Sequence, residues 1–318
     1  ITHFDFSQDG VYLQSNCGAY ELLFSEVASG RQMTSATELK DVNWATWTCT
    51  LGWPVQGIWP AGADGTDINA VDRSHTSHLV ATADDFGKVS LFQYPCVDSS
   101  ATGVLYTGHS SHVMNVRWTI GDTHLISVGG GDKCIFQWKH TISAGGHITT
   151  ELNSTQRSIS HSKSFADDDE DDMIGLDADR GGGDEFMAVK PWLGAIRAPS
   201  NPPPVNNTAP NADLSLHWIH GYSSESTGTN LFYNSVNDII YPAAALGVKL
   251  QQNISTRSSG KECMQMYFTG HDDDITAITI SSDRRYVATG QTASRATKGK
   301  ATVHIWDAIE CRDLSTMS

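Results

Sequence analysis

"TGHSSHVMNVRW" (Thr107–Trp118) and "TGHDDDITAITI" (Thr269–Ile280) have the same pattern of residues, and this repeat decides the fold of the chain. Each begins with Thr-Gly-His, continues through a short polar turn and ends in a stretch where apolar and polar residues alternate. Alternation with a period of two is typical of a half-buried β-strand. A pattern repeated in this way predicts a fold built from several copies of one small β unit.

Four segments of the chain can be laid over each other. Each has an apolar strand, a polar turn, a second strand with Ser or Thr, a turn rich in Gly, Asp or Asn, and a third strand that ends on an aromatic residue. A fourth strand precedes each Gly-His. The segments are Asp5–Phe24, Ala70–Phe92, Asn115–Trp138 and Ala277–Trp306. We therefore predict an all-β fold of antiparallel units, which resembles the WD-repeat blades of a β-propeller.

The blade resemblance implies a structural role for the repeated histidines. In such blades the His packs against the aromatic residue that ends the third strand, and a Ser or Thr and a turn Asp link the two. The hydroxyl position of the third segment is ambiguous, because Ser127 is one residue early and Val128 occupies the expected place. The turn Asp of the fourth segment is missing, replaced by "QTASRATKGKA". The predicted structural residues are His109, Asp132 and Trp138 in the third segment, and His271, Thr289 and Trp306 in the fourth.

A metal or catalytic role for these histidines is the weaker interpretation. His109 and His112 could form a metal-binding pair, but they lie on a turn that leads into a strand, and no third ligand is near in the sequence. The sequence also has no Gly-x-Ser-x-Gly, no phosphate-binding loop and no His-Glu-x-x-His. We therefore predict that the protein is not an enzyme and holds neither a metal nor a cofactor.

The chain divides into three parts. Residues 1–142 carry three repeat units and an aromatic-rich stretch, Val42–Pro60, that alternates like paired strands. Residues 143–211 are a linker that is acidic and rich in Pro and Asn, a composition that opposes helix and strand. Within it, residues 184–196 are apolar enough that we expect them to dock on a propeller. Residues 212–318 hold further strands and the last Gly-His unit.

Closing a propeller ring takes at least about four blades. Three recognisable units before the linker and one or two after it do not make two rings. Two arrangements remain open: a fragment that spans the junction of two propellers, or a single ring completed across the linker. We favour the fragment, also because the chain has no initiator Met and opens directly in strand-like sequence.

Charge and composition exclude several classes of function. The net charge is −15, and residues 167–185 alone contribute −9 through ten acidic residues and one arginine. A nucleic-acid partner is disfavoured, because contacts to phosphates require a basic face. No apolar run approaches eighteen residues, which disfavours a transmembrane helix. The six cysteines form no C-x-x-C pair, which favours a reducing, cytoplasmic location over a disulfide framework or a zinc site.

Several longer segments of the sequence resemble one particular family of WD-repeat proteins. "DVNWATWTCTLGWPVQGIWP" (41–60), "RSHTSHLVATADDFGKVSLFQYPC" (73–96) and the first Gly-His unit look like the end of the tandem-propeller region of echinoderm microtubule-associated protein-like proteins. "LSLHWIHGY" with "NLFYNSVNDIIYPAAALGVKL" (214–222 and 230–250) is similar to the hydrophobic (HELP) motif of that family. "GDEFMAVKPWLGAI" (183–196) resembles the connector of its long members, which repeat the whole unit.

This resemblance implies a non-enzymatic scaffold that binds tubulin or microtubules, in the cytoskeleton and in the ciliary axoneme. The residues themselves give less support, because microtubule surfaces are acidic and so is this chain. The best local candidate for a partner contact is the basic loop with Arg295, Lys298 and Lys300, although a solvated hairpin tip is the plainer interpretation. The alternative function is a propeller scaffold for other proteins, with basic partners favoured by the charge.

Overall fold

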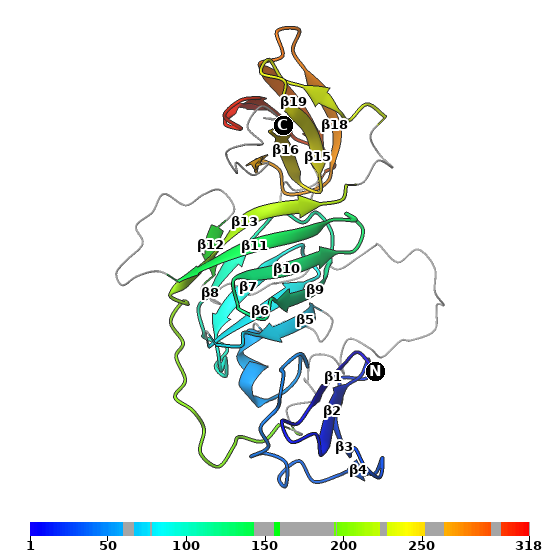
Figure 1. The fold of residues 1–318 in the computed structure, drawn as a ribbon, viewed down its shortest axis with the longest axis vertical. Helices are drawn as coiled ribbons and strands as arrows, with labels where there is room; N and C mark the ends of the chain where they lie inside the picture. Colours follow the sequence, from blue (N-terminus) through cyan, green and yellow to red (C-terminus); the bar gives the residue numbers. More distant parts are fainter. Residues whose placement is uncertain are drawn as a thin grey trace, which may run out of the picture. The chain divides into compact units, whose positions relative to one another are not determined.

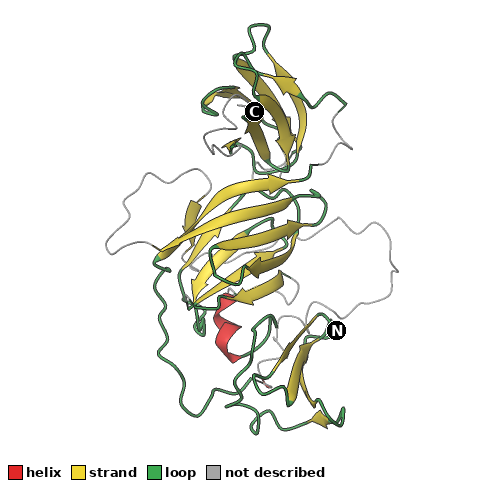
Figure 2. Cartoon of the chain, viewed as in Figure 1, coloured by secondary structure: helices red, strands yellow, loops and turns green. Residues whose placement is uncertain are grey.

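The structure is a computed structural model that describes residues 1–59, 67–76, 78–142, 194, 196–222, 228–251, 264–293 and 300–317, and the backbone of 156–159. It confirms the all-β prediction (Figures 1 and 2). Strand and loop make up the described chain apart from a short 3-10 helix, η1 (Trp53–Ile58). The chain forms two compact units. Unit 1 comprises Ile1–Thr82, Ser90–Val104 and Ser158–Pro210, and unit 2 comprises Ala83–Val89, Leu105–Arg157 and Asn211–Ser318.

Two sheets come mainly from residues 1–106, and one strand of the linker joins the second. The first contains β1 (His3–Phe6), β2 (Tyr12–Asn16), β3 (Leu22–Glu26) and β4 (Gln32–Met33) in chain order. The second has the order β12-β8-β7-β6-β5, with β5 (Ile68–Arg73), β6 (Leu79–Asp84), β7 (Val89–Gln93), β8 (Gly103–Tyr106) and β12 (Gln156–Ile159). β6 and β7 are buried along almost their whole length, as expected of central strands covered on both faces.

The third sheet has the order β13-β11-β10-β9 and is completed from beyond the linker. Its strands are β9 (Val113–Trp118), β10 (His124–Gly129), β11 (Ile135–Ile142) and β13 (Ala212–His220). β11 and β13 pair antiparallel from Ile135 opposite His220 to Ile142 opposite Ala212. The segment "LSLHWIHGY", which the sequence groups with the second part of the chain, thus begins in a sheet of the first part.

Two more four-stranded sheets follow in unit 2. The hydrophobic motif forms β14 (Phe232–Tyr233), β15 (Ile239–Ala243) and β16 (Leu246–Leu250), joined by β17 (Gln265–Phe268). The last sheet contains β18 (Ile275–Ile280), β19 (Tyr286–Gln291), β20 (Val303–Asp307) and β21 (Asp313–Met317). Each of these sheets has four neighbouring strands, which is the make-up of a propeller blade.

The hydrophobic motif is itself a blade-like sheet, and its apolar residues are buried between two others. The amide side chain of Gln265 accepts from the Ile219 N–H (2.8 Å) and donates to the Ile219 carbonyl (3.1 Å), which attaches β17 to β13. On the other side Asn234 donates to the Ala308 carbonyl (2.9 Å). A Cβ on Gly247 would lie 2.7 Å from the Trp306 ring, so the β16 backbone can approach that ring only without a side chain.

The aromatic-rich stretch Val42–Pro60 does not form paired strands, and that prediction was wrong. Its only pairing in the described structure is an isolated bridge between Ser7 and Trp44. Gly52 adopts φ 154°, and Pro54 lies in the first turn of η1, where a proline costs no hydrogen bond. The stretch then packs by its side chains, and Val55, Ile58 and Trp59 join the core of unit 1.

Asp5 ties this stretch to β1. Its carboxylate is 1% exposed and accepts four bonds: from the Thr46 hydroxyl (2.6 Å), the Thr48 N–H (2.9 Å), the Cys49 N–H (3.0 Å) and the Gln14 amide (3.1 Å). Burial acts to raise the pKa of Asp5, but these bonds outweigh it and leave the pKa below its ordinary value. The charged form is therefore the one that the fold holds.

Asp5→Asn should destabilise unit 1 by about 3 kcal/mol at pH 7, because one amide oxygen cannot replace an anion that accepts four donors. Urea unfolding of the full chain measures this cost. Since the folded pKa is lowered, the stabilisation is present above the unfolded value of 3.8 and is lost as the pH falls through the folded one. The difference between wild type and variant should therefore shrink below about pH 3.8. An equal difference at pH 7 and pH 3 would contradict this account.

Candidate functional site

The structure brings the predicted residues of the third segment together in one chain of hydrogen bonds. The Trp138 indole N–H donates to Ser127 Oγ (2.8 Å), and this hydroxyl lies 2.8 Å from His109 Nε2. His109 Nδ1 lies 2.6 Å from Asp132 Oδ2. All four residues are buried, and His109 stacks on Phe136 with ring centroids 3.9 Å apart. The other oxygen of Asp132 accepts from the Cys134 N–H (3.0 Å), which fixes the turn between β10 and β11.

Ser127, not Val128, supplies the hydroxyl of this group. Strand β10 alternates, and Ser127 points to the buried side on which His109 and Trp138 lie. The spacing from the histidine could have settled the ambiguity. His109 and Ser127 are 18 residues apart, and so are His271 and Thr289.

The fourth segment forms the same chain of bonds with one change. The Trp306 indole N–H donates to Thr289 Oγ1 (3.1 Å), and this hydroxyl lies 2.7 Å from His271 Nε2. Where the sequence lacks the turn Asp, the side-chain oxygen of Gln291 lies 2.8 Å from His271 Nδ1. Gln291 in turn donates to Asp272 Oδ1 (2.5 Å). Sequence analysis missed Gln291, although it is the first residue of the stretch that replaces the expected turn.

The missing carboxylate matters for the charge state of His271. Burial is the main cause that lowers its pKa, to about 4 from 6.5, and the bond to neutral Gln291 offsets only part of this. The ring is therefore neutral at physiological pH. A neutral ring can donate a hydrogen bond through Nδ1 to Gln291 and accept one through Nε2 from Thr289. Because both nitrogens already have partners, His271 is not suited to bind a metal ion.

No group of three His, Cys, Asp or Glu that could hold a metal ion is found within the residues that the structure describes. His112, the other member of the considered pair, bonds instead to Asp85, with Nδ1 3.1 Å from Oδ1. In the described part of the chain, no helix is long and apolar enough to cross a membrane.

The basic loop is only partly described. Lys300 is exposed, whereas Arg295 and Lys298 lie outside the described residues. Residues 184–193 of the apolar stretch expected to dock also lie outside them. Its last residue, Ile196, is described and packs against the core of unit 1.

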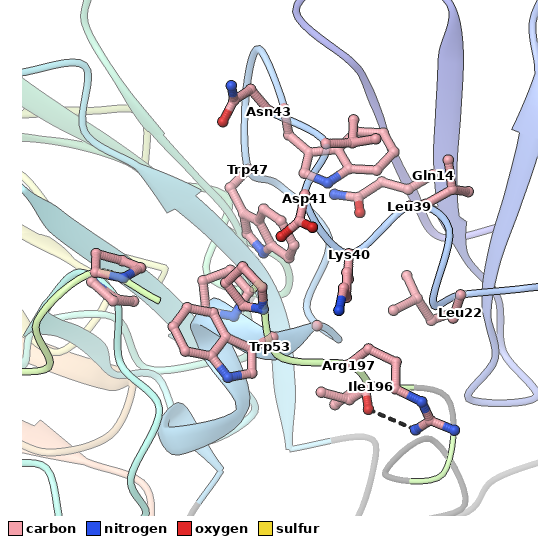
Figure 3. Close-up of a pocket in the computed structure, with 18 of the residues that line it drawn as sticks. Gln14, Leu22, Leu39, Lys40, Asp41, Asn43, Trp47, Trp53, Ile196 and Arg197 are labelled. Atoms are coloured by element: carbon pink, nitrogen blue, oxygen red, sulfur yellow. Dashed lines mark hydrogen bonds between the residues drawn. The ribbon is translucent and has the colours of Figure 1, made fainter. Parts of the chain in front are cut away.

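Unit 1 contains a pocket of about 770 Å³ that sequence analysis did not predict (Figure 3). Its wall is rich in aromatic residues from the irregular stretch, Trp44, Trp47 and Trp53, and the linker residues Ile196 and Arg197 lie along its lower side in that view. The pocket lies in the irregular packing around η1. The strand and helix patterns of the sequence therefore could not predict it.

One cation of the pocket wall is held in place. The Arg73 guanidinium donates to the carbonyls of Trp44 (3.0 Å) and Ala45 (2.9 Å) and lies 5.5 Å from the ring centroid of Tyr94. It thereby fixes the backbone of the irregular stretch next to the ring.

Removing the hydroxyl that links the first group should be costly. Ser127→Ala leaves the Trp138 N–H and His109 Nε2 buried without a partner, so we expect a loss of about 2–3 kcal/mol in the free energy of unfolding. Ser127→Thr, which copies the residue of the other group, should lose less. Chemical denaturation of the full chain measures both, and an equal loss for the two variants would show that the hydroxyl bonds do not carry the effect.

The low pKa of His271 predicts a pH-dependent stability. Below pH 6.5 the unfolded chain takes up a proton at this residue, whereas the folded chain takes it up only near pH 4. Stability should therefore fall by up to about 3 kcal/mol between these values because of this residue. His271→Asn should lack this part of the slope, and His220→Gln, which removes an exposed histidine, should keep it. A wild-type slope in His271→Asn would refute the assignment.

Comparison with family models gives three matches along the chain. The second β-propeller of echinoderm microtubule-associated proteins matches residues 1–140, the HELP motif matches 209–248, and the WD domain, G-beta repeat, matches 261–307. The matches follow the order in which the sheets occur, and the HELP match covers β13, β14, β15 and the first three residues of β16.

Curated relatives give the same result for part of the chain. Human echinoderm microtubule-associated protein-like 3 is 53% identical over 147 residues, which is 46% of this chain and 16% of the relative. The like-4 protein of Xenopus tropicalis is 53% identical over 140 residues, 44% of this chain and 15% of the relative. The like-1 protein of Rattus norvegicus is 52% identical over 139 residues, which is 44% of this chain and 17% of the relative. The chain thus spans about a sixth of the length of these relatives.

The repeated blade-like sheets, the apolar motif between two of them and the identity to these relatives agree with one another. The chain is thus similar to echinoderm microtubule-associated protein-like proteins over its first 140 residues, and to the HELP motif over residues 209–248.

Proposed function

We propose that this chain is part of a non-enzymatic, microtubule-associated scaffold protein that binds tubulin. The similarity of residues 1–140 to echinoderm microtubule-associated protein-like proteins carries this proposal. The chemistry of the two histidine groups agrees with it, because His109 and His271 are buried and both nitrogens of each ring lie within hydrogen-bond distance of a scaffold residue. The same similarity supports a cytoskeletal location, and we extend it to the ciliary axoneme as the finer proposal.

We also propose that the chain contains parts of two propeller units. Residues 1–142 would be the closing blades of one unit, 143–211 a linker, and 212–318 the hydrophobic motif and first WD blade of the next. The pairing of β13 with β11 adds that the boundary at 212 is crossed by a shared sheet.

The charge of the chain constrains how it would bind. With a net charge of −15 it is repelled at long range by the acidic tails of tubulin. We therefore propose a contact away from those tails, through a local basic surface that includes Arg295, Lys298 and Lys300. The same acidity favours the alternative function, a scaffold for other proteins with basic surfaces.

Co-pelleting of the full-length protein with microtubules tests the proposal. We expect enrichment in the pellet, and we expect it to persist on microtubules whose acidic tails have been removed by subtilisin, because removal relieves repulsion. A variant with Arg295, Lys298 and Lys300 all changed to Ala should pellet at least about threefold less, since these cations would make the contact.

The matched control changes Arg31, Lys139 and Arg312 to Ala, which removes the same charge from other exposed positions. It should pellet like the wild type. No enrichment over a salt-washed control would refute tubulin binding. Recovery of non-cytoskeletal complexes in higher yield than tubulin would favour the alternative.

A further inference from the structure

The end of the linker is docked on unit 1. Ser200 donates twice to the carboxylate of Asp41, from its N–H (2.6 Å) and from its hydroxyl (2.7 Å). These two bonds hold the pKa of Asp41 below its ordinary value, so this group is an anion at neutral pH. Further along, the Thr102 N–H donates to the Asn207 carbonyl (2.9 Å), and the Asn207 amide donates to Asp98 (3.1 Å). We call residues 196–203 the strap.

Two residues of the strap are half-buried, and they lie three positions apart. Ile196 and Pro199 are half-buried, whereas the two residues between them and the residues from Ser200 to Pro203 are exposed. Residues three apart lie on the same side of a polyproline II helix, and the run Pro202–Pro204 favours that conformation. The strap thus has the side-chain spacing of a polyproline-type ligand.

The surface below it has the matching chemistry. The strap residues Ile196, Pro199 and Pro203 line the same pocket as Trp47, Trp53 and Tyr94, and Figure 3 shows Ile196 and Trp53 in the same lower part of it. Proline-rich peptides are recognised by aromatic-lined grooves of this kind, since the flat rings pack on the proline rings and little chain entropy is lost.

Two residues that line the pocket each have a buried polar atom without a hydrogen-bond partner in the described structure. Trp47 Nε1, a donor, and Gln14 Oε1, an acceptor, have no hydrogen-bond partner among the described residues. Both residues line the pocket. Leaving such groups unpaired is costly, and an extended peptide offers one acceptor and one donor with each residue.

We propose that the surface under the strap is a binding site for extended, proline-rich peptides that carry a small hydrogen-bond donor for Asp41, and that the strap covers this surface in the free chain. The peptide has an aliphatic residue and a proline three residues apart, followed by a serine. A partner with such a segment would bind after it displaces the strap, while Asn207 keeps the linker attached. This site is independent of the proposed contact with tubulin.

Fluorescence anisotropy with a labelled peptide of residues 196–205 (IRAPSNPPPV) tests the proposal. The protein is the full chain with residues 196–203 replaced by a Gly-Ser sequence of equal length, which empties the site. We expect saturable binding to it, and at least about tenfold weaker binding to the wild-type chain, because a tethered strap competes at a high effective concentration. Asp41→Asn in the emptied chain, or Ile196→Ser with Pro199→Ser in the peptide, should weaken binding at least about fivefold.

A point variant keeps the test valid if the replaced chain fails to fold. Ser200→Glu in the otherwise intact chain places a second anion beside Asp41, which should loosen the strap and increase peptide binding over that of the wild type. Ser29→Glu is the matched control, because Ser29 donates to Glu26 (2.5 Å) in a hairpin turn that does not line the pocket. Binding no stronger than that of a scrambled peptide, or equal gains in both Glu variants, would overturn the proposal. The assay contains no microtubules, so its failure leaves the proposed function untouched.

Discussion

A buried hydroxyl joins a tryptophan to a histidine in the sheet of β9, β10, β11 and β13 and again in the sheet of β18–β21. The arrangement of both sheets depends on this interaction. In both complete examples the indole N–H meets the hydroxyl, and the hydroxyl meets the imidazole. The bonds connect the second and third strands of a sheet to the Gly-His turn that precedes its first strand. These hydrogen bonds hold the Gly-His turn in place, which strand pairing alone would not do.

The two examples differ in how they treat charge. His109 faces the carboxylate of Asp132, whereas His271 faces the amide of Gln291. An amide is sufficient for geometry, because it accepts the same N–H, but it cannot stabilise an imidazolium. The pKa of His271 accordingly falls to about 4 under the influence of burial. The same arrangement can therefore be built with a carboxylate or with an amide opposite the imidazole, and next to the amide the folded His271 takes up a proton only near pH 4.

Local patterns predicted most of this structure, and long-range features escaped them. Alternation and the Gly-His turns located the strands around His109 and His271, because strand faces follow a period of two. Val42–Pro60 alternates equally well, yet residues 42–52 are irregular and a 3-10 helix with Pro54 in its first turn follows at Trp53–Ile58. The pairing of β13 with β11 could not be foreseen, since nothing local marks a strand as belonging to a sheet on the far side of the linker. The pocket escaped for a similar reason, because its walls come from Trp44, Trp53 and the distant Ile196.

That pairing has a consequence for the acidic linker. Ile142 and Ala212 are register partners at the ends of β11 and β13, so the linker leaves and re-enters the sheet at one point, like the loop of an ordinary hairpin. The entropy of closing a loop grows only with the logarithm of its length. Residues can thus be added between these two positions with little effect on the pairing of β11 with β13. A reporter domain inserted within the acidic run should therefore leave this pairing intact.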